Sequence, residues 1–243
     1  MREKQSSLKP WIAAHRAQSS VLIALIVVTL LNSLLAEALT VTGLIEEVTG
    51  TDFFDPEVNT LIDWFEWGVI ALIVVFWIAN FARAARWTTL VYLGYVTFTL
   101  AASVLGLIFT LTERKTPDAA FDLLWDAFVV WTINVIIFSV WYWLVDGGGA
   151  DKRARAQVTR PDFVFPQQSN EIPGWVEWKP GWFDYLFLAF SHSTAFSATD
   201  TAILSRRAKI LVMVQASISL ATLAMIAARA INIIAYSSKP HPA

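Results

Sequence analysis

The sequence predicts an all-α membrane protein with about five transmembrane helices and one re-entrant, pore-type half-helix between the last two. Three observations predict this fold class. Hydrophobic residues make up 56% of the 243 positions, and the mean hydropathy is +0.53. Several apolar stretches exceed about 18 residues, the length that indicates a transmembrane helix. One apolar stretch, which begins near residue 183, ends after only about ten residues, so it can enter a bilayer but cannot cross it.

The expected spans follow one another with short connections. They cover residues 19–39, 60–82, 88–111, 120–145 and 208–236. We expect a solvated acidic loop over residues 43–59 and a basic turn over residues 83–86. The fourth span ends in Trp141, Tyr142 and Trp143, which predict an aromatic belt at the membrane interface.

The chain divides into three parts by composition. A basic segment, residues 1–18, precedes three transmembrane helices within residues 19–119, and residues 120–243 form a pore-like module. Within this module we expect an outer helix at 120–145, a surface loop at 146–182, a re-entrant helix and loop at 183–205, an inner helix at 208–236 and a tail at 237–243. The run Gly147, Gly148 and Gly149 predicts that the outer helix stops there.

Composition also excludes several kinds of chemistry. The chain has no cysteine, so thiolate zinc sites, disulfides and cysteine nucleophiles are excluded. The net charge of -2 gives no reason to expect a nucleic-acid partner. Its three histidines, His15, His192 and His241, are too scattered to predict a metal site, and no Gly-rich phosphate motif is present. We therefore expect no cofactor, no metal ion and no enzymatic activity.

One enzymatic hypothesis stays open beside this expectation. His192, its neighbours Ser191 and Ser193, and Asp200 include the residue types of a catalytic triad. Adjacency in sequence is not triad geometry, because the side chains of a triad must converge in space. An intramembrane enzyme built on His192 and Asp200 would require both side chains to meet at one cavity.

The segment after the short apolar run is rich in hydroxyl groups. Between residues 191 and 201 the chain carries Ser191, Ser193, Thr194, Ser197, Thr199 and Thr201, together with Asp200. Polar backbone at membrane depth requires partners or water, so this pattern favours a re-entrant loop. The alternative is that residues 183–196 dock on the membrane surface.

The fifth span carries a polar stripe. Gln215, Ser219 and Thr222 are spaced by four and three residues, so they share one helix face. This face is a candidate lining for a wet cavity; equally, its side chains could hydrogen bond between helices. Three other polar positions have structural interpretations: Asn134 as a helix–helix hydrogen bond, and Asp63 with Glu66 as a solvated helix start. The alternative for Asp63 and Glu66, which lie one turn apart, is a cation-binding pair.

Lysine and arginine favour the cytoplasmic side of a membrane. With five spans, fourteen of the 18 Lys and Arg residues fall on the side of the N-terminus and of the loop at residues 146–182. The charge rule therefore predicts a multi-pass protein with its N-terminus and this loop in the cytoplasm. One span more or fewer would reverse part of that orientation.

The stretch from Trp182 to Ile233 resembles a family of uncharacterised bacterial integral membrane proteins. The residues that carry the resemblance are Asp184-Tyr185-Leu186-Phe187, then Thr194, Phe196 and Asp200, then Ser205-Arg206 and a final helix ending near Asn232. The resemblance implies a bacterial inner membrane location and carries no settled function with it.

The same half of the chain resembles, more distantly, the pore module of tetrameric potassium channels. This resemblance implies a homo-oligomer, with a tetramer favoured, a lipid bilayer around it and a small permeant ion. It places the filter at Thr194, Phe196, Ser197, Thr199 and Asp200. The segment departs from the potassium filter because it is one residue longer and lacks glycine, so hydroxyl groups replace backbone carbonyls as candidate ion ligands. The potassium-channel analogy also places the loop at residues 146–182 outside the cell, opposite to the charge rule.

Selectivity stays open in the sequence. The C-terminal end of a re-entrant helix and a ring of Asp200 would favour cations, whereas the mouth charges Arg206, Arg207 and Lys209 would attract anions. We expect an oligomeric ion channel or channel-like permease with a hydroxyl-lined constriction between Thr194 and Asp200. The alternative is a non-conducting membrane scaffold or accessory subunit that uses the re-entrant loop as a packing element.

Overall fold

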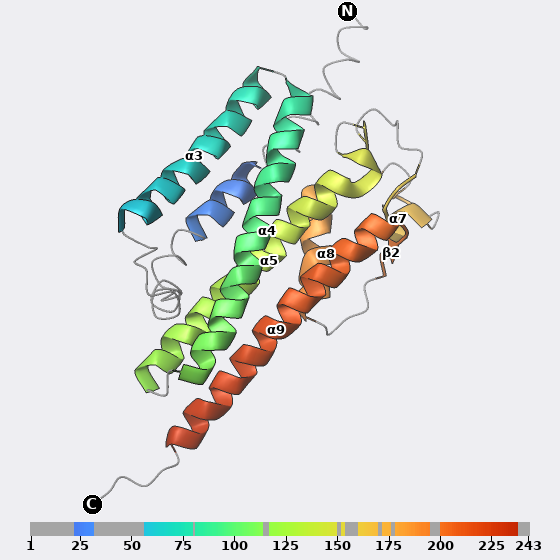
Figure 1. Cartoon of the computed structure of the whole chain (residues 1–243). Helices are drawn as coiled ribbons and strands as arrows, with labels where there is room; N and C mark the ends of the chain where they lie inside the picture. Colours follow the sequence, from blue (N-terminus) through green and yellow to red (C-terminus); the bar gives the residue numbers. More distant parts are fainter. Residues whose placement is uncertain are drawn as a thin grey trace, which may run out of the picture. The chain divides into compact units, whose positions relative to one another are not determined.

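The computed structural model is mostly helical (Figure 1). It describes residues 22–31, 56–79, 81–113, 117–149, 152–153, 160–169, 172–175, 178–194 and 200–237. The long helices are α3 (Pro56–Ile78), α4 (Ala82–Glu113), α5 (Pro117–Val145) and α9 (Arg206–Ser237). Shorter elements are the helix Leu22–Leu31, the 3-10 helix η1 (Asp146–Gly148), β1 (Phe163–Val164), α7 (Pro166–Ser169), α8 (Trp182–Thr194) and β2 (Ala202–Ile203).

The predicted all-α membrane class is confirmed at this level. Four of the described helices are long and apolar enough to cross a membrane: Thr60–Ile78, Arg83–Gly106, Leu124–Gly148 and Arg206–Ala228. They correspond to the second to fifth predicted spans. The first predicted span, residues 19–39, is described only over Leu22–Leu31, and most of the predicted acidic loop, residues 43–59, lies outside the described residues.

The connection between α3 and α4 differs from the predicted basic turn. Arg83 and Arg86 lie inside the first turns of α4, because α3 ends at Ile78 and α4 already begins at Ala82. The Phe81 N–H donates to the carbonyl of Phe76, five residues earlier, at 2.9 Å, whereas an α-helical hydrogen bond joins residues four apart. The prediction of a turn at residues 83–86 was therefore wrong by about one helical turn.

The described chain forms two compact units, and α5 and α9 each contribute to both. Unit 1 comprises Met1–Val27 and Val135–Ala216, and unit 2 comprises Val28–Asn134 and Ser217–Ala243. In unit 2, α3 and α4 run side by side as antiparallel neighbours (Figure 1). Thr29 hydrogen bonds the Tyr92 hydroxyl at 2.5 Å, which attaches the helix Leu22–Leu31 to α4.

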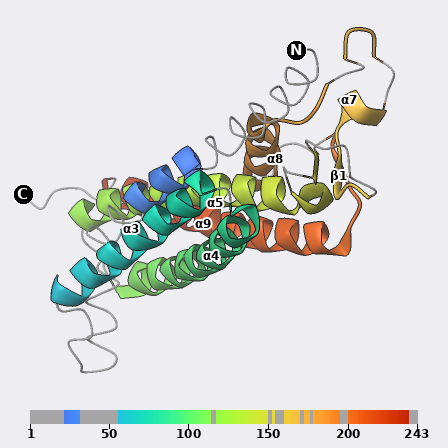
Figure 2. The ribbon, with the colours of Figure 1, turned by 90° about the horizontal axis from the view of Figure 1, so that it is seen from above.

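Unit 1 holds the half-length helix α8 against α5 and α9. In Figure 2, α8 lies obliquely across the line of α5 instead of running alongside it. The short strands β1 and β2 pair antiparallel, with Phe163 opposite Ile203. Phe163 is fully buried and contacts Tyr142 and Tyr185, with ring centroids 5.1 and 6.3 Å apart.

This aromatic cluster corrects one prediction. Tyr142 and Trp143 were expected in an aromatic belt at the membrane interface, but their exposed fractions are 0% and 3%. Both side chains pack inside unit 1, while Trp141 is half-buried. A belt residue must reach the lipid headgroups, so the Trp141–Trp143 run contributes mainly to the core instead.

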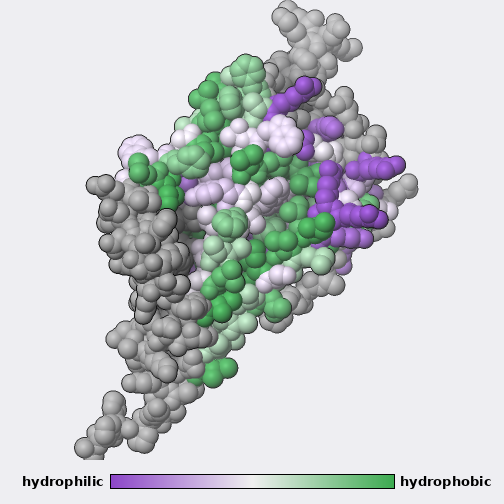
Figure 3. Space-filling model, in the orientation of Figure 1, coloured by the Kyte–Doolittle hydropathy of each residue, from purple (hydrophilic) through white to green (hydrophobic). Residues whose placement is uncertain are grey.

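Large apolar side chains also cover the outside of the molecule. Trp64, Val91 and Phe98 are more than 70% exposed on α3 and α4. Hydrophobic residues spread over the helical surface in Figure 3, while hydrophilic ones gather near the start of α9 and the β1–β2 pair. An exposed apolar surface of this kind is unstable in water and suited to lipid, in agreement with a membrane-embedded protein.

Candidate functional site

The end of α5 is shaped by three consecutive glycines. Gly147, Gly148 and Gly149 have φ angles of 57°, 84° and 105°, a region that L side chains rarely adopt. A Cβ added to Gly148 would lie 2.9 Å from the Lys152 Cδ atom. The predicted helix stop is therefore confirmed, and the glycines turn the backbone sharply around the carboxylate of Asp146.

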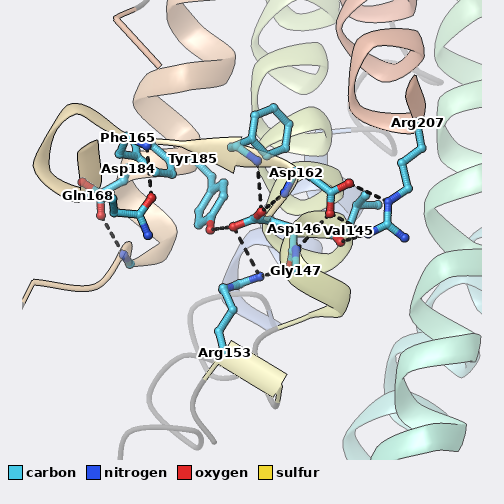
Figure 4. Close-up of polar contacts among 12 residues, drawn as sticks. Val145, Asp146, Gly147, Arg153, Asp162, Phe165, Gln168, Asp184, Tyr185 and Arg207 are labelled. Atoms are coloured by element: carbon cyan, nitrogen blue, oxygen red, sulfur yellow. Dashed lines mark hydrogen bonds and ion pairs between the residues drawn. The ribbon is translucent and has the colours of Figure 1, made fainter. Parts of the chain in front are cut away.

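Asp146 is 3% exposed and collects hydrogen bonds from two segments (Figure 4). Its Oδ1 atom accepts from the backbone N–H groups of Asp162 and Phe163 at 2.8 and 3.1 Å. Its Oδ2 atom accepts from the Tyr185 hydroxyl at 2.5 Å. Three hydrogen bonds to this carboxylate thus join the end of α5 to the start of β1 and to α8.

Arg153 covers the same carboxylate from the other side. Its Nη1 atom donates to the Asp146 carbonyl at 2.6 Å and lies 4.0 Å from Oδ2. The guanidinium lies over the rings of Trp143 and Tyr185, 5.3 and 5.2 Å from their centroids. These distances are within the range of cation–π attraction, so Arg153 contributes charge and packing together.

The second carboxylate, Asp162, holds the start of α9. The Arg207 guanidinium donates to it through two nitrogens, Nε to Oδ1 at 2.7 Å and Nη2 to Oδ2 at 2.5 Å (Figure 4). The Gly147 N–H adds a hydrogen bond to Oδ2 at 2.9 Å. Burial alone would raise the pKa of the Asp162 carboxyl, but hydrogen bonds from Arg207, Ser205 and Gly147 hold this pKa below its ordinary value of 3.8.

We name the group Asp146, Arg153, Asp162, Tyr185 and Arg207 the polar anchor. It connects the end of α5, the strand β1, the helix α8 and the first turn of α9. The Leu204 N–H also donates to the Asp162 carbonyl at 2.9 Å, directly after β2. The anchor and the strand pair therefore fix the backbone on the far side of residues 195–199, while α8 fixes the near side.

The polar end of α8 is bonded within its own helix. The side chains of Ser191, His192, Ser193 and Thr194 each hydrogen bond a backbone carbonyl three or four residues earlier. Among the filter candidates, Thr194 is half-buried and Asp200 is exposed. The other three, Phe196, Ser197 and Thr199, lie outside the described residues.

The polar stripe of α9 faces inward. Gln215 is fully buried, accepts a hydrogen bond from the Tyr142 hydroxyl and donates to the Ala189 carbonyl at 2.8 Å. Ser219, 1% exposed, accepts from the Asn134 Nδ2 atom at 2.6 Å. Thr222 donates to the Ile218 carbonyl at 2.9 Å. The open alternative, hydrogen bonding between helices, describes Gln215 and Ser219; a cavity lined by these residues stays a prediction.

The predicted mouth charges separate into two kinds. Arg206 and Lys209 are exposed in the first turn of α9, whereas Arg207 belongs to the polar anchor. Ser205 caps this helix, because its hydroxyl accepts from the Ala208 N–H at 3.1 Å. Sequence reasoning missed Asp162 as a functional position. The signal that could have found it is a single acid placed directly before the apolar aromatic run Phe163-Val164-Phe165.

The fold and the site define a class: a mostly helical, membrane-embedded protein that holds the 13-residue helix α8 against α5 and α9 through the polar anchor, whose two carboxylates are buried. Comparison with protein families, with curated proteins and with solved structures finds no match to this chain. Inferences about its function therefore depend on its own residues.

Proposed function

We propose that this protein is the subunit of an oligomeric ion channel or channel-like permease. In this proposal residues 120–243 form the pore module, α8 is its re-entrant helix, and the segment between Thr194 and Asp200 is the constriction. The protein is a bacterial inner-membrane protein with five spans, and the pore-module resemblance favours a tetramer.

The observation that carries this proposal is the geometry of α8. Its 13 residues correspond to about 20 Å of helix, less than the ~30 Å of a hydrocarbon core. One face is buried in unit 1 through Tyr185, Leu188 and Ala189, and the other exposes Phe183, Phe187 and Phe190. An apolar helix too short to span, flanked by two helices that can span, is the arrangement expected of a pore helix.

The polar anchor supports the proposal from the other end. A constriction needs its backbone held at both flanks, because ion ligands must stay in place without a rigid element of their own. Here Thr194 ends α8, and the β1–β2 pair with the Asp162–Arg207 ion pair holds the chain from Ala202 onward. Hydroxyl groups within the constriction, from Thr194, Ser197 and Thr199, are the candidate ion ligands.

The direct test is ion flux through purified protein reconstituted in liposomes. We expect flux of small monovalent ions that is reduced by Thr199→Val, which keeps the side-chain shape and removes the hydroxyl. The matched control is Thr132→Val, on the outer helix, where the hydroxyl donates to the Phe128 carbonyl. Absence of flux for cations and anions alike, with protein that is folded and oligomeric, would contradict the proposal.

One observation favours a second candidate, the non-conducting scaffold. The polar groups of Gln215 that would line a cavity already bond Tyr142 and Ala189 inside unit 1, which is typical of a packing element. The two candidates differ in water access. Since the chain has no other cysteine, Ser197→Cys can be labelled with a charged thiol reagent. Labelling from the aqueous phase is expected for the channel, and protection is expected for the scaffold.

A further inference from the structure

A buried carboxyl group lies inside a membrane-spanning helix of unit 2. Glu66 was expected in a solvated helix start, but it is 1% exposed, so that interpretation was wrong. It sits within the apolar segment Thr60–Ile78 of α3, six residues or about 9 Å past the start of that segment. Ionisable residues at such positions are costly and are usually tied to function.

Two tyrosines of the neighbouring helix α4 are partners of this carboxyl group. Tyr92 and Tyr95 both have Glu66 as a side-chain hydrogen-bond partner. They are three residues apart and therefore lie on one face of α4. Tyr92 is 2% exposed and is also held by Thr29 at 2.5 Å. The Glu66 carboxyl group therefore lies among hydroxyl groups within an otherwise apolar helix pair.

One acid lies a single helical turn from Glu66 on α3. Asp63, one turn earlier on α3, is half-buried and acts electrostatically on Tyr95. The closest arginine of α4 in sequence is Arg86, six residues before Tyr92, or about 9 Å along the helix. Asp126 on α5 is another buried acid of unit 2, at 5% exposure. Burial disfavours the carboxylate form of Glu66, and the two hydroxyl donors favour it.

We propose that Glu66 is a proton-binding site within the membrane, with Tyr92 and Tyr95 as the hydroxyl groups that stabilise its ionised form. Burial favours the neutral acid and two hydroxyl donors favour the carboxylate, so both protonation states can be occupied without a cationic partner. In the sequence, residues 43–55 before α3 contain four acids and no Lys or Arg, and Glu57 follows in the first turn of α3. Acidic residues raise the local proton concentration.

The test is infrared difference spectroscopy of the reconstituted full-length protein during a pH titration. Acidification is expected to produce a carboxylic-acid C=O band that Glu66→Gln removes and that Asp63→Asn and Asp126→Asn retain. Tyr95→Phe removes a donor to the ionised form, so it is expected to move the midpoint of this band upward by about one pH unit. Tyr95→Phe keeps the ring and its contact with Phe65, which preserves a readout if Glu66→Gln fails to fold.

Three outcomes would overturn the assignment. The band could persist in Glu66→Gln, which would give it to another acid. It could be constant over the whole titration, which would mean a fixed protonation state. The midpoint could move with sodium chloride but not with choline chloride, which would make a metal cation the competing ligand. The same midpoint in both salts supports the proton site, whether or not the protein conducts ions.

Discussion

The ion pair between Asp162 and Arg207 should be the main support of the start of α9, and Arg207→Gln tests it. The substitution removes both guanidinium hydrogen bonds to Asp162, and also the one to the Val145 carbonyl at 3.3 Å. It leaves the Asp162 carboxylate, whose side chain is 2% exposed, with only its backbone and hydroxyl donors. Hydrogen bonds to charged groups contribute about 1.5–3 kcal/mol. Removing one partner of a fully buried pair costs about 3–5 kcal/mol.

The exposure of Arg207 determines where, between these limits, the loss in the free energy of unfolding falls. Its side chain is 57% exposed, so water replaces part of the lost interaction and screening weakens it. We expect a loss of about 2 kcal/mol in the free energy of unfolding. For a chain of this size, that corresponds to a melting temperature lower by about 4–8 °C.

The assay is thermal unfolding in detergent with a matched control. Arg206→Gln, at the neighbouring exposed position, removes the same charge from the same helix end and should change the melting temperature by less than about 1 °C. Arg207→Lys should recover only part of the stability, because an ammonium group cannot donate in the planar, two-pronged geometry of arginine. Equal melting temperatures for Arg207→Gln and Arg206→Gln would refute the reasoning.

The pH dependence gives an independent check of the same pair. The pKa of Asp162 in the folded protein lies below its ordinary value of 3.8, so folding favours the ionised form. This contribution to stability is present above pH 3.8 and is lost as the pH falls through the lower, folded-state pKa. The stability difference between the wild type and Arg207→Gln should therefore be full at neutral pH and shrink at acidic pH.

Two further substitutions test other parts of unit 1 and unit 2. Gly148→Ala should lower the free energy of unfolding by about 1–2 kcal/mol, since it forces a side chain into φ 84° and against Lys152. Its control, Gly68→Ala, adds a Cβ with nothing within 4 Å inside a helix, so it should raise the free energy of unfolding by up to about 1 kcal/mol. Chemical unfolding in detergent measures both, and equal effects would contradict the role given to the glycine run. Gln215→Ala should lower the free energy of unfolding by about 2–3 kcal/mol, because it removes two buried hydrogen bonds and leaves the Ala189 carbonyl buried. Its control is Ser217→Ala, at an exposed position on the same helix. A loss no larger than that of the control would count against the buried contact.

The helices could be predicted from the sequence because hydrophobic length is a local property. The apolar stretches at residues 60–82 and 208–236 correspond to α3 and α9 within a few residues, and the short run at 183–193 corresponds to α8. The sequence could not show whether a given face of a helix packs against protein or meets water. Gln215 shares a helix face with Ser219 whether that face meets water or protein, and only the positions of Tyr142 and Ala189 decide it.

The polar anchor shows the same limit for charges. Arg206 and Arg207 are adjacent and chemically identical, so sequence reasoning treated both as mouth charges. Their difference arises from Asp162, 45 residues earlier, which meets one arginine and not its neighbour through the register of β1 with β2. Glu66 was misjudged for a related reason: its partners Tyr92 and Tyr95 lie on another helix, and helix periodicity on α3 alone carries no information about that helix.

The order in which the hydrogen-bonding partners of unit 1 occur along the chain has a consequence for biosynthesis. The chain is made from its N-terminus, so α8 leaves the ribosome before its partner Gln215, which follows Ala189 by 26 residues. Arg207 likewise emerges 45 residues after Asp162. During that interval the half-length helix has no α9 to hold it, and Asp162 has no guanidinium. The hydrogen bonds of Arg207 and Gln215 that complete unit 1 can therefore form only after α9 has been made, whereas the hydrogen bond between Tyr185 and Asp146 can form before it.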